Sequence, residues 1–142
     1  MSESKSAVVS RIGLGLLFIV FGLNGFFGFL PMPPHDGEAG AFLGALAKTG
    51  YMFPLIKGTE VVAGVLLLLG RAPAFALVLL APIVVNIVLF HAILEPAGLL
   101  LGLVALALGV YLAWQYWPQF SPIFRSPERR LRAQPKEASA HG

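Results

Sequence analysis

The chain has 142 residues, of which 57% are hydrophobic and only 12% are charged, and it contains no cysteine. Soluble domains carry about 25% charged residues, so the composition indicates an integral membrane protein, and the lack of cysteine excludes disulfides, thiol redox chemistry and thiolate metal sites. The net charge of +3 does not indicate nucleic-acid binding, because half of the Lys and Arg residues lie in the last eighteen residues and form no basic patch interleaved with aromatic residues.

Four apolar segments predict membrane-spanning helices. Each has roughly 19 to 23 residues, and about 20 helical residues cross a bilayer core; none alternates with the period of two expected of barrel strands. The first segment is longer than the apolar region of a secretory signal and lacks a small-x-small cleavage pattern, so we expect it to be retained. The predicted spans lie near residues 8–30, 51–69, 73–94 and 97–117.

The connections between these segments predict an antiparallel four-helix bundle. The turns at residues 70–72 and at "EPAG" (95–98) are so short that the helices they join must lie side by side. The longer connection, residues 32–50, has an apolar periodicity that predicts a short helix on the membrane surface. We expect residues 1–125 to form one transmembrane domain and residues 126–142 to form a basic, disordered tail.

The distribution of basic residues predicts the orientation. If the amino terminus is cytoplasmic, eight Lys and Arg residues lie inside and two lie outside, which satisfies the positive-inside rule. Both termini are therefore expected in the cytoplasm. The inner set is Lys5, Arg11, Arg71, Arg125, Arg129, Arg130, Arg132 and Lys136, and the outer set is Lys48 and Lys57.

Polar residues on three of the predicted helices lie at similar depths. At a rise of 1.5 Å per residue, Asn24 and Glu60 lie about 9 Å below the outer surface, Asn86 about 12 Å and His91 about 4.5 Å. A polar group within a membrane span is costly, so such residues are expected to face the bundle interior. These four residues are therefore candidate ligand-binding residues of a polar pocket in the outer third of the bundle.

Two further residues, nearer the membrane rim, are expected to support the candidate site. Lys57 lies three residues before Glu60 and can pair with it, and Glu95 lies four residues after His91. Asn86 and His91 are about 140° apart on an ideal helix, so both can face one pocket only if the helix bends. A simpler interpretation is that the asparagines join helices by hydrogen bonds and that the charged residues are ion pairs. A zinc site is not predicted, because one histidine and scattered carboxylates make no ligand motif.

The order of features resembles the DoxX-like family of small bacterial membrane proteins. The similar stretches are "RIGLGLLFIVFGLNGFFGF" and "TGYMFPLIKGTEVVAGVLLLLGRAPAFALVLLAPIVVNIVLFH", within residues 9–125, and include Glu60-x-x-x-Gly64 and the Gly70-Arg71 turn. The resemblance implies a four-helix bundle in the inner membrane of a bacterium. It also implies a link to thiosulfate:quinone oxidoreductase and to redox or stress-related membrane complexes. It implies candidate site residues, without assigned roles, at Asn24, Glu60, Asn86 and His91.

Two hypotheses for function follow. In the first, the chain is a membrane subunit that binds a quinone or a similar lipophilic ligand, with His91 or Asn86 bonding a carbonyl and Glu60 or His91 relaying a proton. Because the chain carries no redox group, a partner protein would supply the electrons. In the second, it is a non-enzymatic scaffold or assembly protein whose polar residues only fix helix packing. Transport is less favoured for a four-helix monomer, although a homo-oligomer is left open.

Overall fold

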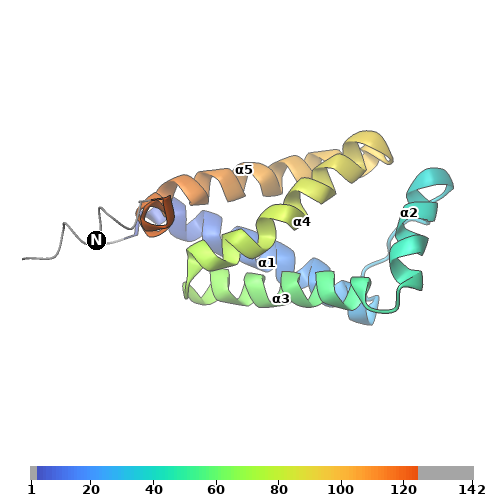
Figure 1. The fold of residues 1–142 in the computed structure, drawn as a ribbon, viewed down its shortest axis with the longest axis horizontal. Helices are drawn as coiled ribbons and strands as arrows, with labels where there is room; N and C mark the ends of the chain where they lie inside the picture. Colours follow the sequence, from blue (N-terminus) through green and yellow to red (C-terminus); the bar gives the residue numbers. More distant parts are fainter. Residues whose placement is uncertain (1–2, 125–142) are drawn as a thin grey trace, which may run out of the picture.

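All regular structure in residues 3–124, the part that the computed structural model describes, is helical. Four long helices are each apolar and long enough to span a membrane, which confirms the prediction of a multi-pass membrane protein (Figure 1). The predicted basic tail, residues 126–142, lies outside the described residues. The long helices are α1 (Lys5–Phe27), α3 (Met52–Leu69), α4 (Pro73–Ile93) and α5 (Leu99–Gln115), the last preceded by the 3-10 turn η1 (Pro96–Gly98).

The long helices form an antiparallel bundle in which each packs against two neighbours. α1 packs most extensively on α3, α3 on α4, α4 on α5, and α5 returns to α1. The start of α1 and the end of α5 lie at the same end of the bundle, here called the terminal end (Figure 1). The opposite end, where α1 and α4 finish, is called the loop end. This arrangement confirms the predicted antiparallel four-helix bundle.

Local signals in the sequence explain where the helices begin and end. The side chain of Ser4 caps α1 by accepting a hydrogen bond from the amide of Ala7 at 3.2 Å. Gly28 has a left-handed φ of 58°, so α1 ends at Phe27, three residues earlier than predicted. Gly70 ends α3 in the same way with a φ of 67°. Pro73 then occupies the first position of α4, where its missing N–H costs nothing.

Residues 32–50 contain the predicted short helix, α2 (Gly37–Lys48), which runs across the loop end, transverse to the long helices (Figure 1). The ring of Phe42 lies 5.7 Å from the ring of Phe90 on α4. Beyond α5, the short helix α6 (Trp117–Phe120) and the 3-10 turn η2 (Ser121–Phe124) close the described chain at the terminal end.

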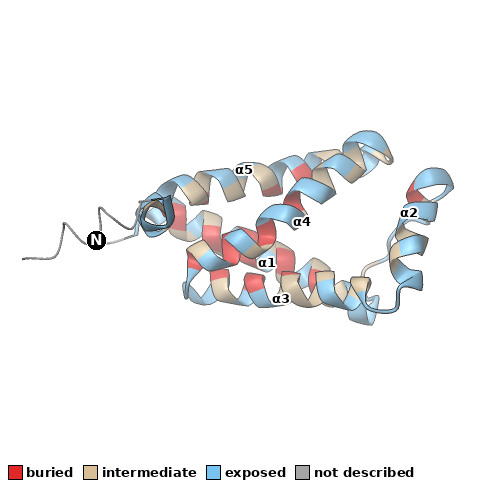
Figure 2. Ribbon diagram, in the orientation of Figure 1, coloured by how far each residue is buried: buried red, intermediate tan, exposed pale blue. Residues whose placement is uncertain are grey.

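The core runs between the four helices, and most of the outer surface is apolar. Buried residues line the facing sides of the long helices, whereas many large apolar side chains are exposed on their outer sides (Figure 2). A contiguous apolar surface of this kind is rare in soluble proteins and is what a bilayer would cover. The largest fully buried side chains are Phe18, Leu14, Leu67, Leu80 and Leu112.

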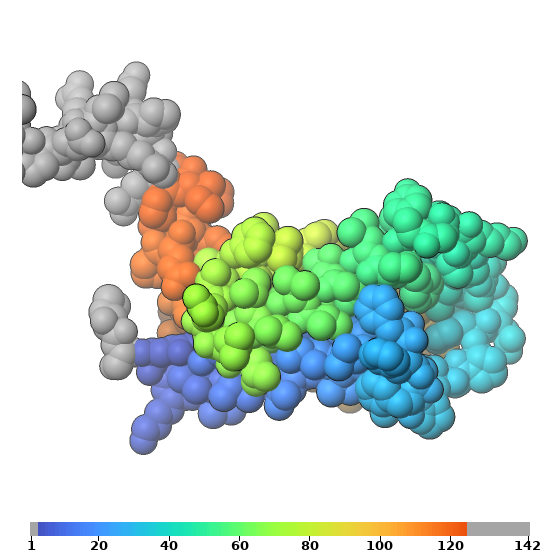
Figure 3. Space-filling view, turned by 90° about the horizontal axis from the view of Figure 1, so that it is seen from below, coloured from blue at the N-terminus to red at the C-terminus, as the bar shows by residue number. Residues whose placement is uncertain are grey.

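The closest helix contact is between α1 and α3, which lie side by side along the molecule (Figure 3). A Cβ added to Gly15 would lie 2.9 Å from the carbonyl oxygen of Gly64, and one added to Gly64 would lie 2.8 Å from the carbonyl oxygen of Gly15. Glycine at both positions therefore lets the two backbones touch, as small residues do in membrane bundles.

Candidate functional site

Glu60 is the most deeply buried of the predicted site residues. Its residue is 2% exposed, and Lys57 Nζ donates hydrogen bonds to the two carboxylate oxygens at 2.9 and 3.1 Å. The spacing of three residues predicted this pair. Because both residues belong to α3, the charge of the carboxylate is neutralised within its own helix.

Two glycines of α1 make the space for this ion pair. A Cβ on Gly25 would lie 2.5 Å from Cγ of Lys57, and one on Gly22 would lie 3.1 Å from Cβ of Glu60. The stem of Lys57 therefore crosses α1 at Gly25, and Glu60 faces α1 at Gly22. The ion pair is placed at the interface between α1 and α3 and not in an open pocket.

Asn24 lies at the same level but uses its side chain to finish its own helix. Its Oδ1 accepts a hydrogen bond from the amide of Leu30 at 2.6 Å, and its backbone carbonyl accepts one from the amide of Gly28 at 2.8 Å. The side chain is half-buried. Asn24 therefore stabilises the end of α1 and makes no hydrogen bond to Glu60 in the described structure.

Asn86 lies at the same height along the bundle as the Lys57–Glu60 pair, but its side chain is exposed whereas that of Glu60 is buried. It lies thirteen residues after Pro73, and Lys57 lies twelve residues before Leu69, so each is about 18–20 Å along its helix from the turn between α3 and α4. The side chain of Asn86 is exposed on the surface of α4. Within residues 3–124 it makes no hydrogen bond or ion pair.

His91 belongs to a separate set of contacts at the loop end. Its Nδ1 lies 2.8 Å from the backbone carbonyl oxygen of Glu95, and its ring packs so closely on Gly98 that any Cβ there would collide with it. The carboxylate of Glu95 pairs instead with Nδ1 of His35, which precedes α2. The predicted contact between residues 91 and 95 is thus made through the backbone, and the side chain of Glu95 ties the α2 segment to the end of α4.

His35 was not among the predicted site residues, because a single histidine in a proline-rich loop has no spacing that points to a partner sixty residues away. Arg11 was predicted only as a charge that sets orientation. One signal was available for Arg11: it lies inside the first apolar segment, where a charged side chain needs a partner.

Arg11 is the centre of a buried polar network at the terminal end. It is 8% exposed, donates Nε–H to Glu3 at 3.0 Å and donates Nη1–H to the carbonyls of Leu67 and Leu68 at the end of α3. Tyr116, which follows α5, donates its hydroxyl to the same Glu3 carboxylate. Burial and this neighbouring carboxylate raise the pKa of Tyr116. The network joins the amino-terminal segment, α1, α3 and the end of α5.

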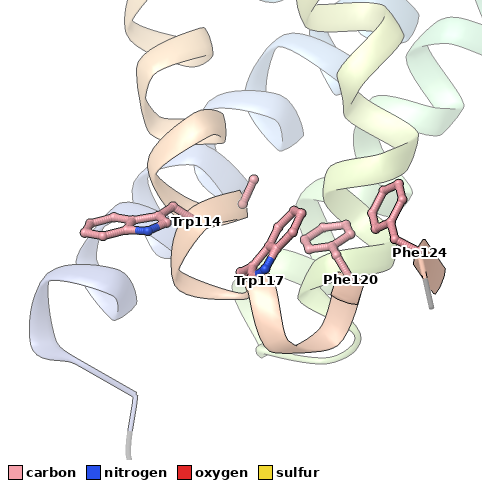
Figure 4. A pocket seen from close by; sticks show the side chains of 5 residues that line it. Trp114, Trp117, Phe120 and Phe124 are labelled. Carbon is pink, nitrogen blue, oxygen red and sulfur yellow. The ribbon is translucent and has the colours of Figure 1, made fainter. Parts of the chain in front are cut away.

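Two apolar hollows open on the terminal half of the bundle. One, of about 340 Å³, is lined by aromatic side chains that follow or end α5 (Figure 4). The other, of about 230 Å³, lies between α4 and α5 and reaches the core at Leu14 of α1. None of Asn24, Glu60, Asn86 and His91 lines either hollow. The first is lined by Ala113, Trp114, Trp117, Phe120 and Phe124.

The candidate residues are therefore divided among separate contacts and do not converge on one hollow. The structure brings Lys57 to Glu60 and His91 to Glu95, places Asn24 at the same level, and turns Asn86 outward. In the described range no group of three or more His, Cys, Asp or Glu side chains is placed to hold a metal ion.

Comparison of the chain with protein-family models, with curated proteins and with solved structures gives no match. The resemblance to the DoxX-like family therefore stays a prediction.

Proposed function

We propose that the chain is a non-enzymatic scaffold or assembly subunit of a membrane, in which the polar residues fix how the helices and the α2 segment pack. One observation carries this proposal. In the described part of the chain every buried side-chain nitrogen and oxygen has a hydrogen-bond partner. Glu60, Asn24 and His91 each form at least one side-chain hydrogen bond within the chain.

The position of the contacts supports this role. The Arg11 network joins four segments at the terminal end, and the His35–Glu95 pair joins α2 to α4 at the loop end. Between them, α1 and α3 touch through Gly15 and Gly64. Polar contacts at both ends and the close contact of α1 with α3 between them hold the helices in one arrangement. A subunit against which other membrane components pack requires such a fixed arrangement.

A second candidate function is the binding of a quinone or a similar lipophilic ligand. It is favoured by the exposed amide of Asn86, which has no hydrogen bond in residues 3–124 and faces the region that lipids occupy. A quinone diffuses within the bilayer, and its carbonyl accepts the kind of hydrogen bond that this amide donates. A partner protein would supply the electrons, since the chain has no cysteine and encodes no redox group.

One experiment separates the two functions. The protein is purified in detergent, its lipid extract is assayed for quinones, and its melting temperature is measured with and without added ubiquinone. The scaffold proposal expects no co-purified quinone and no quinone-dependent shift. It also expects Glu60→Gln and His91→Ala to lower the stability of the protein. Any change in cellular phenotype should then be proportional to the change in protein level. Val62→Ala, on the exposed side of α3, serves as the neutral control. Stable variants that lose the phenotype would contradict it.

We also propose the DoxX-like assignment and a bacterial inner membrane with both termini in the cytoplasm. Lys5, Arg11 and Arg71 lie at the terminal end, and Lys48 and Lys57 lie toward the loop end, as the positive-inside rule requires for this orientation. Alkaline phosphatase and green fluorescent protein fusions test it. Fluorescence is expected from a fusion at residue 142 and phosphatase activity from a fusion in the loop before α2; the reverse pattern would overturn the orientation.

A further inference from the structure

Asn86 is an exposed polar residue of a membrane-spanning helix and lies away from both of its ends. It lies about 20 Å from the start of α4 and about 10 Å from its end. Its amide carries two N–H donors and one carbonyl acceptor, and no group in residues 3–124 bonds to it. In a bilayer, where no water reaches the hydrocarbon core, an unbonded amide is strongly unfavourable. A partner outside residues 3–124 is therefore expected at that depth.

The residues around Asn86 form an exposed stripe with the spacing of a helix–helix seam. Along α4 the stripe alternates steps of four and three residues, which is the heptad pattern of two helices that pack along their length. Ile93 is 72% exposed and Leu89 is 51% exposed, so this side of α4 is not covered by the chain's own helices. The stripe consists of Phe75, Leu79, Pro82, Asn86, Leu89 and Ile93, of which only Leu79 is half-buried.

Within this heptad pattern Asn86 occupies the position called a, together with Leu79 and Ile93, while Leu89 occupies position d. A single asparagine at an a position fixes register and favours a defined number of strands, because its amide pairs with the same amide of the neighbouring helix. The pattern thus points to a parallel helix pair with the two amides opposite each other.

A second copy of this chain meets these requirements without further assumptions. Copies inserted in one orientation place Asn86 at the same depth, and a two-fold axis along the membrane normal brings the two α4 helices together in parallel. Each amide then donates to the carbonyl oxygen of the other. A different protein would need a polar group at a matching depth by chance.

We propose that two copies of the chain associate in the membrane through the α4 stripe, with the Asn86 amides hydrogen-bonded across the interface. The inference goes beyond the packing role proposed above and does not depend on it, because Asn86 forms no hydrogen bond or ion pair with the residues of 3–124 that carry that role. Failure of one proposal would leave the other in place.

Single-cysteine crosslinking tests the interface directly, since the chain has no cysteine of its own. Leu89→Cys and Ile93→Cys keep Asn86 and lie on the stripe, whereas Val62→Cys and Leu103→Cys are exposed on α3 and α5 and serve as controls. The full chain is placed in vesicles of phosphatidylethanolamine and phosphatidylglycerol and oxidised with copper phenanthroline. Disulfide-linked dimers are expected from the stripe variants and several-fold less dimer from the controls.

The amide is tested in the Leu89→Cys background. Asn86→Leu is expected to weaken dimerisation about three- to thirty-fold, the range that one interhelical hydrogen bond gives in membranes. Asn86→Gln retains an amide and is expected to restore part of the loss. Far-UV circular dichroism and the fluorescence of Trp114 and Trp117 show whether each variant is folded.

Four outcomes would overturn the proposal. Equal crosslinking of stripe and control positions indicates random collision. Stripe crosslinking that Asn86→Leu leaves unchanged removes the amide from the interface. The folded protein could stay monomeric in vesicles but crosslink through α4 to another protein in native membranes. That result would show that a different protein, and not a second copy, covers the α4 stripe. Monomeric protein that loses quinone binding on Asn86→Leu identifies a ligand in its place.

Discussion

Removing Lys57 while leaving Glu60 in place should destabilise the bundle strongly. The Glu60 side chain is 3% exposed, and in the described structure its only hydrogen-bond partner is the Lys57 ammonium. Lys57→Met keeps the stem that fills the space at Gly25 but leaves a buried carboxylate without its partner. Breaking a buried pair in this way costs about 3–5 kcal/mol. The opposite change, Glu60→Gln, should lower the unfolding free energy by less than Lys57→Met does. The lysine side chain is longer than that of glutamate and can extend its ammonium toward the membrane surface.

The double variant Lys57→Met/Glu60→Met provides the decisive comparison. Replacing both members of a buried pair by apolar residues is often neutral or stabilising, so the double variant should be more stable than Lys57→Met alone. The unfolding free energy is measured by titration with sodium dodecyl sulfate in dodecylmaltoside micelles, followed by circular dichroism. The deficit of Lys57→Met should shrink at acidic pH, where a protonated carboxyl carries no charge. A single variant as stable as the double variant at neutral pH would refute the reasoning.

Three further predictions concern other contacts and use the same assay. Arg11→Met should lower the unfolding free energy by about 2–3 kcal/mol, because buried acceptors lose their donor, and Arg11→Lys should recover only part of it. Gly15→Ala should destabilise, since the new Cβ would lie 2.9 Å from the Gly64 carbonyl, whereas Gly13→Ala, which meets nothing within 4 Å, should not. The pKa of Tyr116 is raised in the folded state, so its contribution to the unfolding free energy should be complete below about pH 10 and fall as the pH rises above that value. Tyr116→Phe should not show this loss of stability at alkaline pH. If the variant lost as much stability at alkaline pH as the original protein, the role given to Tyr116 would be contradicted.

The spans and the depths of polar residues could be predicted from the sequence because both depend on distance along a helix. Length and apolar composition define each span, and a rise of 1.5 Å per residue places Asn24, Glu60 and Asn86 at one level. The pair of Lys57 and Glu60 is equally local, since it depends on spacing within one helix. The structure has four long apolar helices in these regions of the chain and the Lys57–Glu60 pair within α3.

The direction and the partners of the polar side chains could not be predicted in the same way. Depth says nothing about rotation around the helix axis, and the expectation that Asn86 faces the bundle interior assumed that the chain alone satisfies its amide. The contacts of His35 with Glu95 and of Tyr116 with Glu3 join residues 60 and 113 positions apart in the sequence. Such contacts depend on how all the helices pack together, and a local sequence pattern does not predict that packing.

The polar contacts at the two ends of the bundle join different segments of the chain. At the terminal end Arg11 bonds α3 directly, so α1 and α3 cannot slide past each other without breaking charged hydrogen bonds. At the loop end the Lys57–Glu60 pair stays within α3, and only side-chain stems and glycines touch α1. The α2 segment is held there by His35 and Phe42. The terminal end therefore holds α1 and α3 in register, whereas the contacts at the loop end hold the α2 segment against α4.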